Sequence, residues 1–307
     1  MIEIQEGLKG NDLDSIQLRI MNTTFFIGIS NSQHNDWKNE VTSFLQYIER
    51  SFSRFESQNE LWWFNQANKD EVIQVSPVLY DILLKAEEYR RKTEGRFSPF
   101  LLNHMEAHGY NRSFPFIAAS EEVPYKKKEP LENEPLQFYD RYYIKKNTNQ
   151  PIDLGGIAKG YAVEATAKWL KENAKSRYGI VDGGGDMSVW SNGEKTWKIG
   201  IMNPFHEEEQ LGSFQIENGG IATSNIIYRS WWQGKNKKHH LLDGRTGNPV
   251  DSSIVQATVI MDHCLDAEIG AKICFMKDQM PIQSVLATLD KPFQYCVVHS
   301  DGQLEQE

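Results

Sequence analysis

Cysteine is scarce in this chain, whose 307 residues include only Cys264, Cys274 and Cys296. These cysteines form no CxxC pair and are odd in number, which is typical of a protein from a reducing compartment. The first residues are acidic and polar, without the basic and apolar regions of a secretion signal, and no cysteine near the start marks a lipid anchor. We therefore expect a cytoplasmic protein, unless a leader has been removed.

The chain also lacks an excess of positive charge and a long apolar run. Its net charge is −9 and its lysines and arginines are scattered, which argues against nucleic acid or an anionic membrane surface as the main partner. No apolar stretch approaches the roughly 20 residues that span a bilayer, so we expect no integral membrane segment. The length and the hydrophobic share of 39% indicate a folded protein with a sizeable core.

Apolar periodicity predicts a mixture of strands and helices. Strands are expected at 17–30, at 177–190 with an interruption by three glycines, and at 196–202, 211–216, 221–224, 254–261, 284–289 and 294–299. Helices are expected at 36–51, at 77–92 with Ser76 as the N-cap, at 157–175 and at 264–276. Charged and proline-bearing residues near 120–150 indicate an exposed insertion, with an edge strand at 137–147. We expect the α+β class, with a mainly antiparallel sheet flanked by helices, as one domain over 1–307 or as two intimately packed lobes.

Residues 152–164 have the local chemistry of an anion site. They read IDLGGIAKGYAVE: Asp153 ends a short apolar strand, two glycines follow, and Lys159 lies in the first turn of a helix that begins near Ile157. Glycines let a ligand approach backbone N–H groups, while the helix start and the lysine add positive charge. The segment matches neither the Walker pattern nor the dinucleotide fingerprint. A glycine turn with a solvated lysine is the alternative.

Two further clusters follow in the second half of the chain. Residues 182–186 read DGGGD after a hydrophobic strand, which suits close approach of a planar ligand or a phosphate; a tight turn shaped by its aspartates is the alternative. Residues 239–249 read HHLLDGRTGNP. If 238–242 form a strand, His240 points to one face as a proton acceptor and Asp243 lies at the strand end; a turn with surface histidines is the alternative. Adjacent histidines point apart, which disfavours a zinc site.

The helix expected at 264–276 carries an acid and a lysine at related positions. Glu268 and Lys272 are four residues apart and therefore share one helix face. Without further context, an ordinary surface pair is the simpler interpretation.

Taken together, these clusters resemble the ApbE family, the FAD:protein FMN transferases once labelled thiamine-biosynthesis lipoproteins. The resemblance runs from Met21 to about Cys274 and keeps the family's order. The matching segments are MNTTFFI, SRFESQNELWWFN, TEGRFSPFL, DLGGIAKGYAVE, VDGGGDM, IATSN and HHLLDGRTGNP. Each is weak alone, but the series in register is specific. It implies an ApbE-like, T-fold-related architecture.

The resemblance implies a phosphoryl transfer in which the FMN half of FAD moves to a Thr or Ser hydroxyl of a partner flavoprotein and AMP leaves, usually with Mg²⁺. It implies FAD contacts for Met21, Phe55, Ser98, Asp153, Lys159, Asp186, Thr223 and Leu241. His240 would be the base toward the acceptor hydroxyl, and Asp243 would help to shape that site. The metal would face Gly156, Glu268 and position 272.

Lys272 departs from the family pattern, which has a threonine four residues after the acidic ligand. An ammonium at this position repels Mg²⁺ unless it is well screened, so Lys272 either turns outward or supplies part of the metal's charge. If it blocks the metal, Lys272→Thr is expected to raise Mg²⁺ dependence and activity. Three hypotheses stay open: an FAD-dependent FMN transferase, which we favour, a flavin-binding protein without catalysis, and an FAD pyrophosphatase that yields FMN and AMP.

Overall fold

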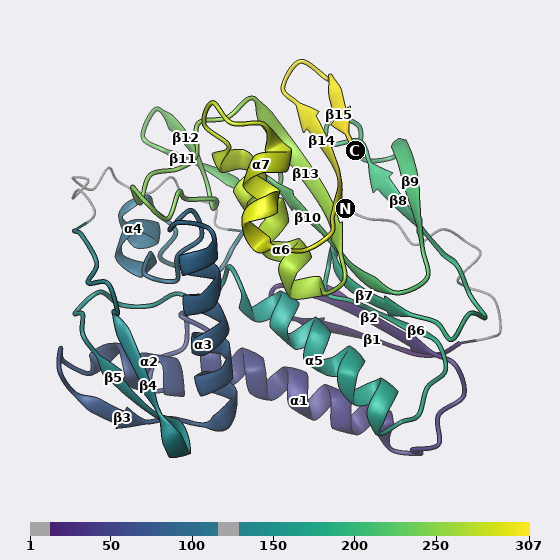
Figure 1. Cartoon of the computed structure of the whole chain (residues 1–307), viewed down its shortest axis with the longest axis horizontal. Coiled ribbons are helices and arrows are strands. Elements are labelled where there is room, and N and C mark those ends of the chain that lie inside the picture. Colours follow the sequence, from purple (N-terminus) through teal and green to yellow (C-terminus); the bar gives the residue numbers. More distant parts are fainter. Residues whose placement is uncertain (1–12, 116–128) are drawn as a thin grey trace. The chain divides into compact units, whose positions relative to one another are not determined.

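The structure is a computed structural model that describes residues 13–115 and 129–307. The described residues form two compact units (Figure 1). Unit 1 comprises the described residues up to Tyr47 together with Lys159–Asn225 and Ser252–Glu307. Unit 2 comprises the described residues of Ile48–Ala158 together with Ile226–Asp251. The predicted site residues divide between these units.

Unit 1 is built on an eight-stranded sheet in which all neighbouring strands are antiparallel. In spatial order its strands are β1 (Asp14–Ile20), β2 (Thr23–Ile29), β6 (Gly179–Asp182), β7 (Asp186–Trp190), β10 (Gly219–Asn225), β13 (Ile254–Met261), β14 (Gln294–His299) and β15 (Leu304–Gln306). The expectation of a mainly antiparallel sheet is confirmed.

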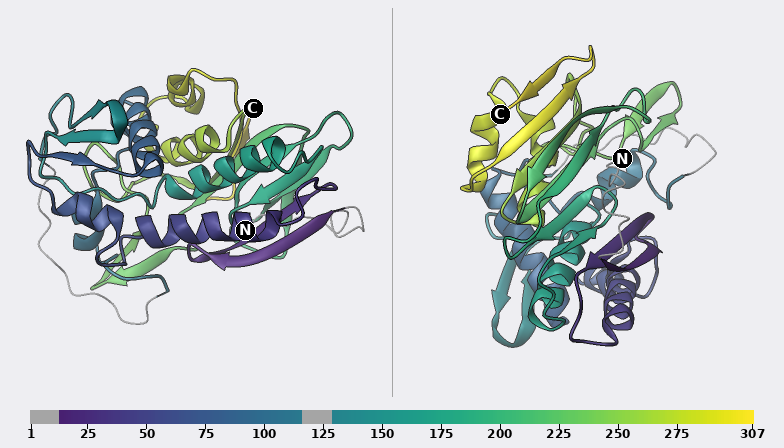
Figure 2. Two further views of the ribbon diagram at one scale, coloured as in Figure 1. Left: turned by 90° about the horizontal axis from the view of Figure 1, so that it is seen from below. Right: turned by 90° about the vertical axis from the view of Figure 1, so that its right-hand side faces the viewer.

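Helices cover one face of this sheet and a hairpin covers the other. Figures 1 and 2 show α5 (Ala158–Glu172) and α6 (Cys264–Ile273) along the same face. The approach of α6 is close, because a side chain at Gly220 of β10 would overlap the backbone of Cys264. On the opposite face, β8 (Trp197–Met202) and β9 (Gln210–Ile216) pack on the sheet through a fully buried core that includes Trp197, Met187 and Ile221. The sheet therefore separates two distinct side-chain environments.

Each of the helices α5 and α6 carries a glutamate that binds a backbone N–H near the start of the other helix. Glu164 of α5 accepts the backbone N–H of Leu265 at 3.1 Å, and Glu268 of α6 accepts the backbone N–H of Gly160 at 3.0 Å. The first N–H groups of a helix have no partner within the helix and carry partial positive charge, so each carboxylate stabilises the other helix's start. These bonds fix the two helices to each other at the end that carries Lys159.

Two elements of unit 1 differ from the expected ones. The single strand expected at 17–30 is a hairpin, because Met21 and Asn22 adopt φ of 50° and 56° and turn the chain between β1 and β2. The strand expected at 284–289 is wrong as well: α7 (Ile282–Leu286) continues into the 3₁₀ turn η4 (Ala287–Leu289). The core positions there, Ile282, Val285, Leu286 and Leu289, follow helical spacing. After α6, the chain forms the 3₁₀ turn η3 (Cys274–Met276).

Unit 2 combines helices of different lengths with two small sheets. Its elements include α2 (Glu60–Gln66), β3 (Val72–Gln74), α3 (Pro77–Lys92), α4 (Leu102–Ala107), β4 (Leu136–Tyr139), η2 (Asp140–Tyr142), β5 (Tyr143–Lys146), β11 (Ser230–Gln233) and β12 (Asn236–His239), and α1 (Trp37–Phe52) begins in unit 1 and ends here. The expected cap of α3 is confirmed, since Ser76 Oγ accepts the N–H of Leu79 at 3.1 Å.

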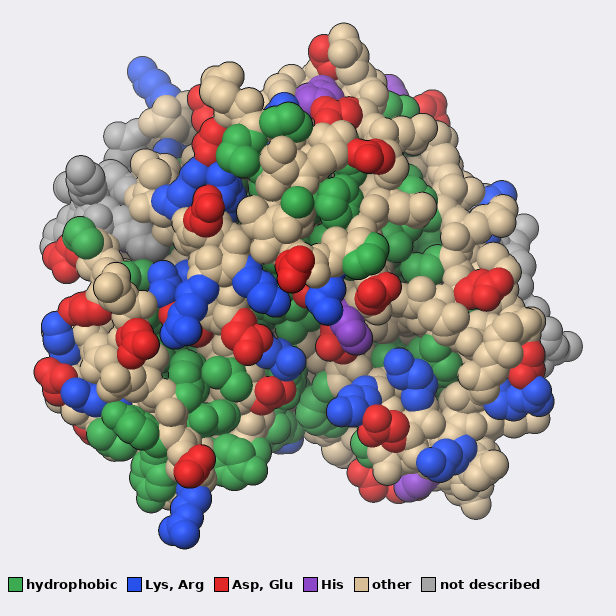
Figure 3. Space-filling model, in the orientation of Figure 1, with side chains coloured by type: hydrophobic (Ala, Val, Ile, Leu, Met, Phe, Trp, Pro, Cys, Tyr) green, Lys and Arg blue, Asp and Glu red, His purple; other side chains and the backbone are tan. Residues whose placement is uncertain are grey.

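The three-stranded sheet of unit 2 has the order β3-β5-β4 and an exposed aromatic face. Figure 3 shows hydrophobic side chains gathered over it, and Tyr139, Tyr142 and Tyr143 are among the exposed aromatics. The edge strand expected at 137–147 is wrong, because these residues form a hairpin whose edge strand is β4 and whose β5 is central. Of the insertion expected near 120–150, residues 120–128 lie outside the described residues.

None of the helices in 13–115 and 129–307 combines the length and the apolar run that a membrane span requires.

Candidate functional site

In unit 1, the predicted residues of α5, β7 and α6 form one charged cluster. Lys159, the second residue of α5, makes an ion pair with Asp186 at the start of β7. Glu268 of α6 is fully buried, and the Nζ of Lys272 lies 2.9 Å from its Oε1. Its other oxygen, Oε2, accepts the N–H of Gly160. The cluster thus joins two lysines to two buried carboxylates around the start of α5.

The carboxylates of the cluster lie deeper than the lysines. The side chains of Asp186 and Glu268 are 4% and 0% exposed, while those of Lys159 and Lys272 are 19% and 14% exposed. Burial raises the pKa of Glu268 above its ordinary value, although the Lys272 ammonium acts in the opposite direction. A buried carboxylate is costly without a charged or hydrogen-bonding partner. Each lysine therefore stabilises an acid that is more buried than the lysine itself.

This geometry corrects one expectation. Glu268 and Lys272 are not an ordinary surface pair, because Glu268 is fully buried. The anion that Gly160 N–H binds at the start of α5 is the carboxylate of Glu268, so that donor is already engaged. Gly160 has no room for a side chain, since a Cβ there would overlap Glu268 Oε2 and lie 3.3 Å from its Cβ. Lys159 is itself only partly buried.

The cluster does not fit a magnesium ion. Both oxygens of Glu268 face donors, Gly160 N–H and the Lys272 ammonium, where a metal would need them as ligands. At about 4 Å and an effective dielectric constant of about 20, a divalent ion and an ammonium repel by about 8 kcal/mol. Within the part of the chain that the structure describes, no group of three or more His, Cys, Asp or Glu side chains is placed to hold a metal.

The glycine segment between β6 and β7 is a tight turn. Asp182 Oδ1 accepts the N–H groups of Gly184 and Gly185 at 2.8 and 2.9 Å, and both glycines have positive φ. Asp182 therefore shapes the turn, which confirms the turn interpretation for this residue, while Asp186 pairs with Lys159. Burial raises the pKa of Asp182 to about 6.

Met21 lies beside this turn, and Thr223 lies on the other face of the sheet. A side chain at Gly184 would overlap Thr23, the second residue after Met21, so the β1–β2 turn adjoins the glycine turn. Thr223 Oγ1 is 2.8 Å from Thr258 Oγ1. Because side chains alternate along β10, Thr223 shares the face of the buried Ile221, opposite to that of Asp186. The structure therefore does not bring Thr223 to the charged cluster, and its predicted FAD contact stays a prediction.

In unit 2, Asp153 is held by an arginine that the sequence analysis missed. Arg54 Nη1 lies 2.8 Å from Asp153 Oδ2, and both side chains are less than a tenth exposed. The guanidinium lies 4.6 Å from the ring centre of Phe55 and 4.2 Å from that of Tyr110. The signal in the sequence was slight, a single arginine directly before the predicted flavin-binding aromatic Phe55. No strand forms at Asp153, whose N–H donates to the Pro99 carbonyl at 2.8 Å.

The same unit brings Ser98 close to the turn that begins at Asp243. Gly244 N–H donates to the Arg96 carbonyl at 2.8 Å, and a side chain at Gly244 would lie 2.8 Å from Ser98 Cβ. Arg245 binds Asp243 through Nε at 3.0 Å and Nη2 at 2.6 Å. Asp243 therefore shapes a turn and is paired with an arginine, and its expected role in the acceptor site stays a prediction.

His240 lies just beyond the end of a strand. The strand considered for 238–242 is not formed past His239, where β12 ends. Afterwards the chain folds back, and the Leu241 carbonyl accepts the N–H of Val250 at 3.1 Å. His240 Nδ1 lies 3.4 Å from the Arg229 carbonyl. Burial lowers the pKa of the neighbouring His239. Gly156 lies in the turn that leads into α5 and is half-buried.

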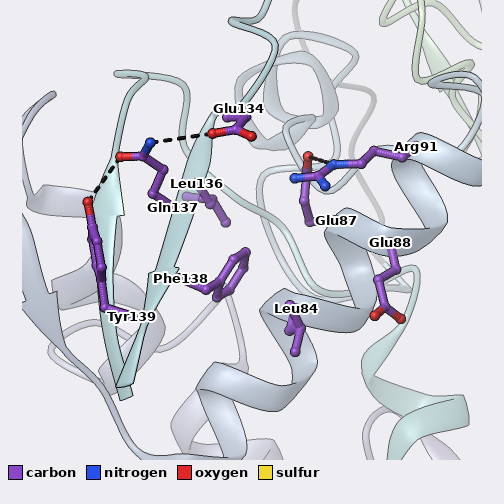
Figure 4. A pocket seen from close by; sticks show the side chains of 9 residues that line it. All are labelled: Leu84, Glu87, Glu88, Arg91, Glu134, Leu136, Gln137, Phe138 and Tyr139. Atoms are coloured by element: carbon purple, nitrogen blue, oxygen red, sulfur yellow. Dashed lines mark hydrogen bonds and ion pairs between the residues drawn. The ribbon is translucent and has the colours of Figure 1, made fainter. Parts of the chain in front are cut away.

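A pocket of about 370 Å³ in unit 2 contains none of the predicted site residues. It lies between α3 and β4, and Figure 4 shows Leu84 and Phe138 facing each other across it. Its rim carries an ion pair between Arg91 Nε and Glu87 Oε1 at 3.0 Å. Nothing in its lining points to the chemistry of the charged cluster.

The described residues combine an antiparallel α+β fold with a charged cluster at the start of α5. The sequence profile of the ApbE family matches residues 21–296, and the chain belongs to this family. It is 26% identical over 249 residues to the FAD:protein FMN transferase of Escherichia coli K12, covering 78% of this chain and 71% of that protein. It is 34% identical over 125 residues to a protein of the same name from Klebsiella pneumoniae strain 342, covering 40% and 38%.

Solved structures agree on the fold. The ApbE protein of Thermotoga maritima superposes with a TM-score of 0.80 at 21% identity, over 96% of this chain and 97% of that one. The flavin transferase ApbE of Vibrio cholerae gives a TM-score of 0.72 at 20% identity, over 96% and 97%. The predicted family resemblance and the α+β class are therefore confirmed.

Proposed function

We propose that this chain is an enzyme that transfers FMN from FAD to a protein acceptor. The observation that carries the proposal is the match to relatives named FAD:protein FMN transferase across 78% of the chain, in a chain whose family membership is established. The charged cluster adds support, because Lys159 places an ammonium at a helix start, where phosphate is favourably bound.

The proposed reaction is a phosphoryl transfer in which one P–O bond forms and another breaks. A Thr or Ser hydroxyl oxygen of the acceptor attacks the phosphorus of the FMN half. The bond between this phosphorus and the bridging oxygen breaks, and its electron pair leaves with AMP. The hydroxyl proton goes to a base. Catalysis of this kind depends on positioning and on neutralising charge that develops on the phosphate oxygens.

We assign the base to His240 and the phosphate contact to Lys159. If His240 Nδ1 donates to the Arg229 carbonyl, Nε2 carries the lone pair that accepts the hydroxyl proton. Phe55, which is 40% exposed beside the Arg54 guanidinium, is available to stack against the flavin ring. Asp153 is the second FAD contact, and Arg54 fixes its carboxylate.

Only the family resemblance implies magnesium, and the proposed reaction does not require it. The Glu268–Lys272 pair does not suit a divalent ion, so no step of the proposed reaction passes through one. The acceptor is proposed by class alone, a flavoprotein with a target Thr or Ser, and a cytoplasmic location is likewise proposed from the sequence.

Product analysis tests the proposal. The protein is incubated with FAD and flavodoxin-like acceptors that carry a target Thr, and the acceptor is inspected for covalent flavin fluorescence after denaturing electrophoresis while AMP is measured by chromatography. Fluorescent acceptor with an equal amount of AMP is expected. AMP with free FMN would instead indicate an FAD pyrophosphatase, and bound but unchanged FAD a flavin-binding protein.

A matched pair of histidine variants isolates the proposed base. His240→Ala is expected to abolish labelling while FAD still binds, because the proton acceptor is lost but the phosphate contacts are not. His206→Ala removes an exposed histidine of unit 1 and is expected to label at the rate of the unaltered protein. Equal labelling by both variants would contradict the assignment of His240.

A further inference from the structure

We propose that Lys272 is a built-in cation of the phosphate site, so that FAD binding and FMN transfer by this chain need no divalent metal. The inference rests on the proposed function only for the transfer step; its part on FAD binding is independent of it. The starting observation is the 2.9 Å ion pair between Lys272 Nζ and Glu268 Oε1, the acid at which the family resemblance implies a metal.

The position of Lys272 is fixed by the fold. Glu268 is fully buried and cannot follow a mobile partner, because its Oε2 is bound to Gly160 N–H at the start of α5. Lys272 is one helical turn further along α6, and its Nζ also lies 3.4 Å from the Glu268 carbonyl. The ammonium is therefore held in one place by its own helix, as a bound ion would be held by ligands.

The charge of Lys272 is linked to the proposed phosphate contact at Lys159. Glu268 links the two lysines: one of its oxygens binds the residue after Lys159, and the other binds Lys272. The side chains of both lysines are more exposed than those of the acids they pair with, so they are more accessible to a ligand than the buried carboxylates. Two fixed positive charges beside a helix start suit the two phosphates of a dinucleotide.

The ammonium of Lys272 can donate a further hydrogen bond to a ligand. An ammonium has three N–H donors, and the contacts of Lys272 Nζ within the described residues are all to Glu268, through Oε1 and the backbone carbonyl. One donor therefore remains for a phosphate oxygen. In the transfer step, Lys272 keeps its proton: it donates a hydrogen bond to a phosphate oxygen while the bridging P–O bond breaks and AMP takes the electron pair.

The test measures FAD binding and Mg²⁺ binding separately from transfer. FAD affinity is followed by quenching of flavin fluorescence without acceptor, in EDTA and in millimolar Mg²⁺, and Mg²⁺ binding is followed by calorimetry. For the unaltered protein, equal FAD affinity under both conditions and no heat of Mg²⁺ binding are expected. FAD binding that EDTA abolishes and Mg²⁺ restores would overturn the proposal.

Variants at position 272 locate the effect. Lys272→Thr is expected to weaken FAD binding in EDTA about ten- to hundredfold, the loss of one charge-assisted hydrogen bond, with partial recovery in Mg²⁺, whereas Lys272→Arg retains affinity. Lys168→Thr, which removes an exposed lysine of α5, serves as the matched control and is expected to bind FAD as before. Unchanged affinity of Lys272→Thr in EDTA would show that the lysine is not the cation.

A second variant keeps the test valid if Lys272→Thr fails to fold. Lys272→Thr leaves Glu268 buried without its cation, so the double variant Glu268→Gln/Lys272→Met removes both charges and keeps an acceptor for Gly160 N–H. It is expected to fold, to bind FAD about ten- to hundredfold more weakly, and to gain nothing from Mg²⁺. Undiminished binding by this folded variant would refute the proposal. Metal-independent FAD binding without any AMP formation would instead refute the proposed transferase function and leave the role of Lys272 in binding intact.

Discussion

The buried carboxyl of Asp182 is expected to make the stability of the protein depend on pH. This carboxyl is buried at the end of β6, where Oδ1 accepts the N–H groups of Gly184 and Gly185. Burial raises its pKa from 3.8 to about 6, and the neighbouring Asp186 carboxylate adds to this rise while the two backbone donors and Lys159 oppose it. We therefore predict that Asp182→Asn, which keeps the shape and an acceptor oxygen, changes the pH dependence of stability.

The sign of this effect follows from proton linkage. Below pH 3.8 the carboxyl is protonated in both the folded and the unfolded chain. Between 3.8 and about 6 the folded protein keeps a proton that the unfolded chain has released, so the free energy of unfolding falls as pH rises. A shift of about two units corresponds to about 3 kcal/mol. Above pH 6 the whole amount is lost, and Asp182→Asn recovers it.

The assay is urea unfolding at several pH values between 4 and 7.5. At pH 7.5 Asp182→Asn is expected to unfold with a free energy up to about 3 kcal/mol higher than the unaltered protein, and the difference is expected to vanish near pH 4. Asp262→Asn, at an exposed position before α6, is the control and shows no such trend. A less stable Asp182→Asn at pH 7.5, or a difference that does not change with pH, would refute the reasoning.

Two further predictions concern the cluster and the arginine. Gly160→Ala forces its Cβ against Glu268 and is expected to lower the free energy of unfolding by about 1–3 kcal/mol and to weaken FAD binding; Gly212→Ala, with no atom within 4 Å of its Cβ, is the control in the same urea and fluorescence assays. Arg54→Met leaves Asp153 buried without its cation and is expected to cost about 3–5 kcal/mol in urea unfolding, so a loss below about 1 kcal/mol contradicts the buried pair.

Local signals in the sequence predicted much of the fold. The cap of α3 by Ser76, the strand β13 and the helix α6 all depend on short-range patterns, namely a capping hydroxyl, a run of β-branched residues and apolar spacing. The elements that were predicted wrongly are those whose secondary structure is decided by tertiary contacts. The short segment Ile282–Leu289 contains apolar residues that suit a strand or a helix, and burial of one helical face selected the helix.

The sequence predicted which residues gather in the charged cluster, but not how deeply each of them is buried. Sequence identified Lys159, Asp186 and Glu268, yet gave no sign that Glu268 is fully buried, because its burial comes from the packing of α6 on the sheet. It also could not place Thr223 on the opposite face from Asp186, since that depends on the pairing of β10 with β7 and β13. Arg54 was missed because its partner Asp153 is almost a hundred residues away.

The lysine at position 272 and the acid at position 268 belong together for a structural reason. Glu268 binds the N–H of Gly160, and Glu164 binds that of Leu265, so the acid joins α6 to α5 whether or not a ligand is present. A fully buried carboxylate in this role needs a positive partner. Lys272 meets that need from one helical turn away. Without a lysine at position 272, Glu268 would be buried without a cation, so the lysine preserves both the α5–α6 junction and a positive charge beside it.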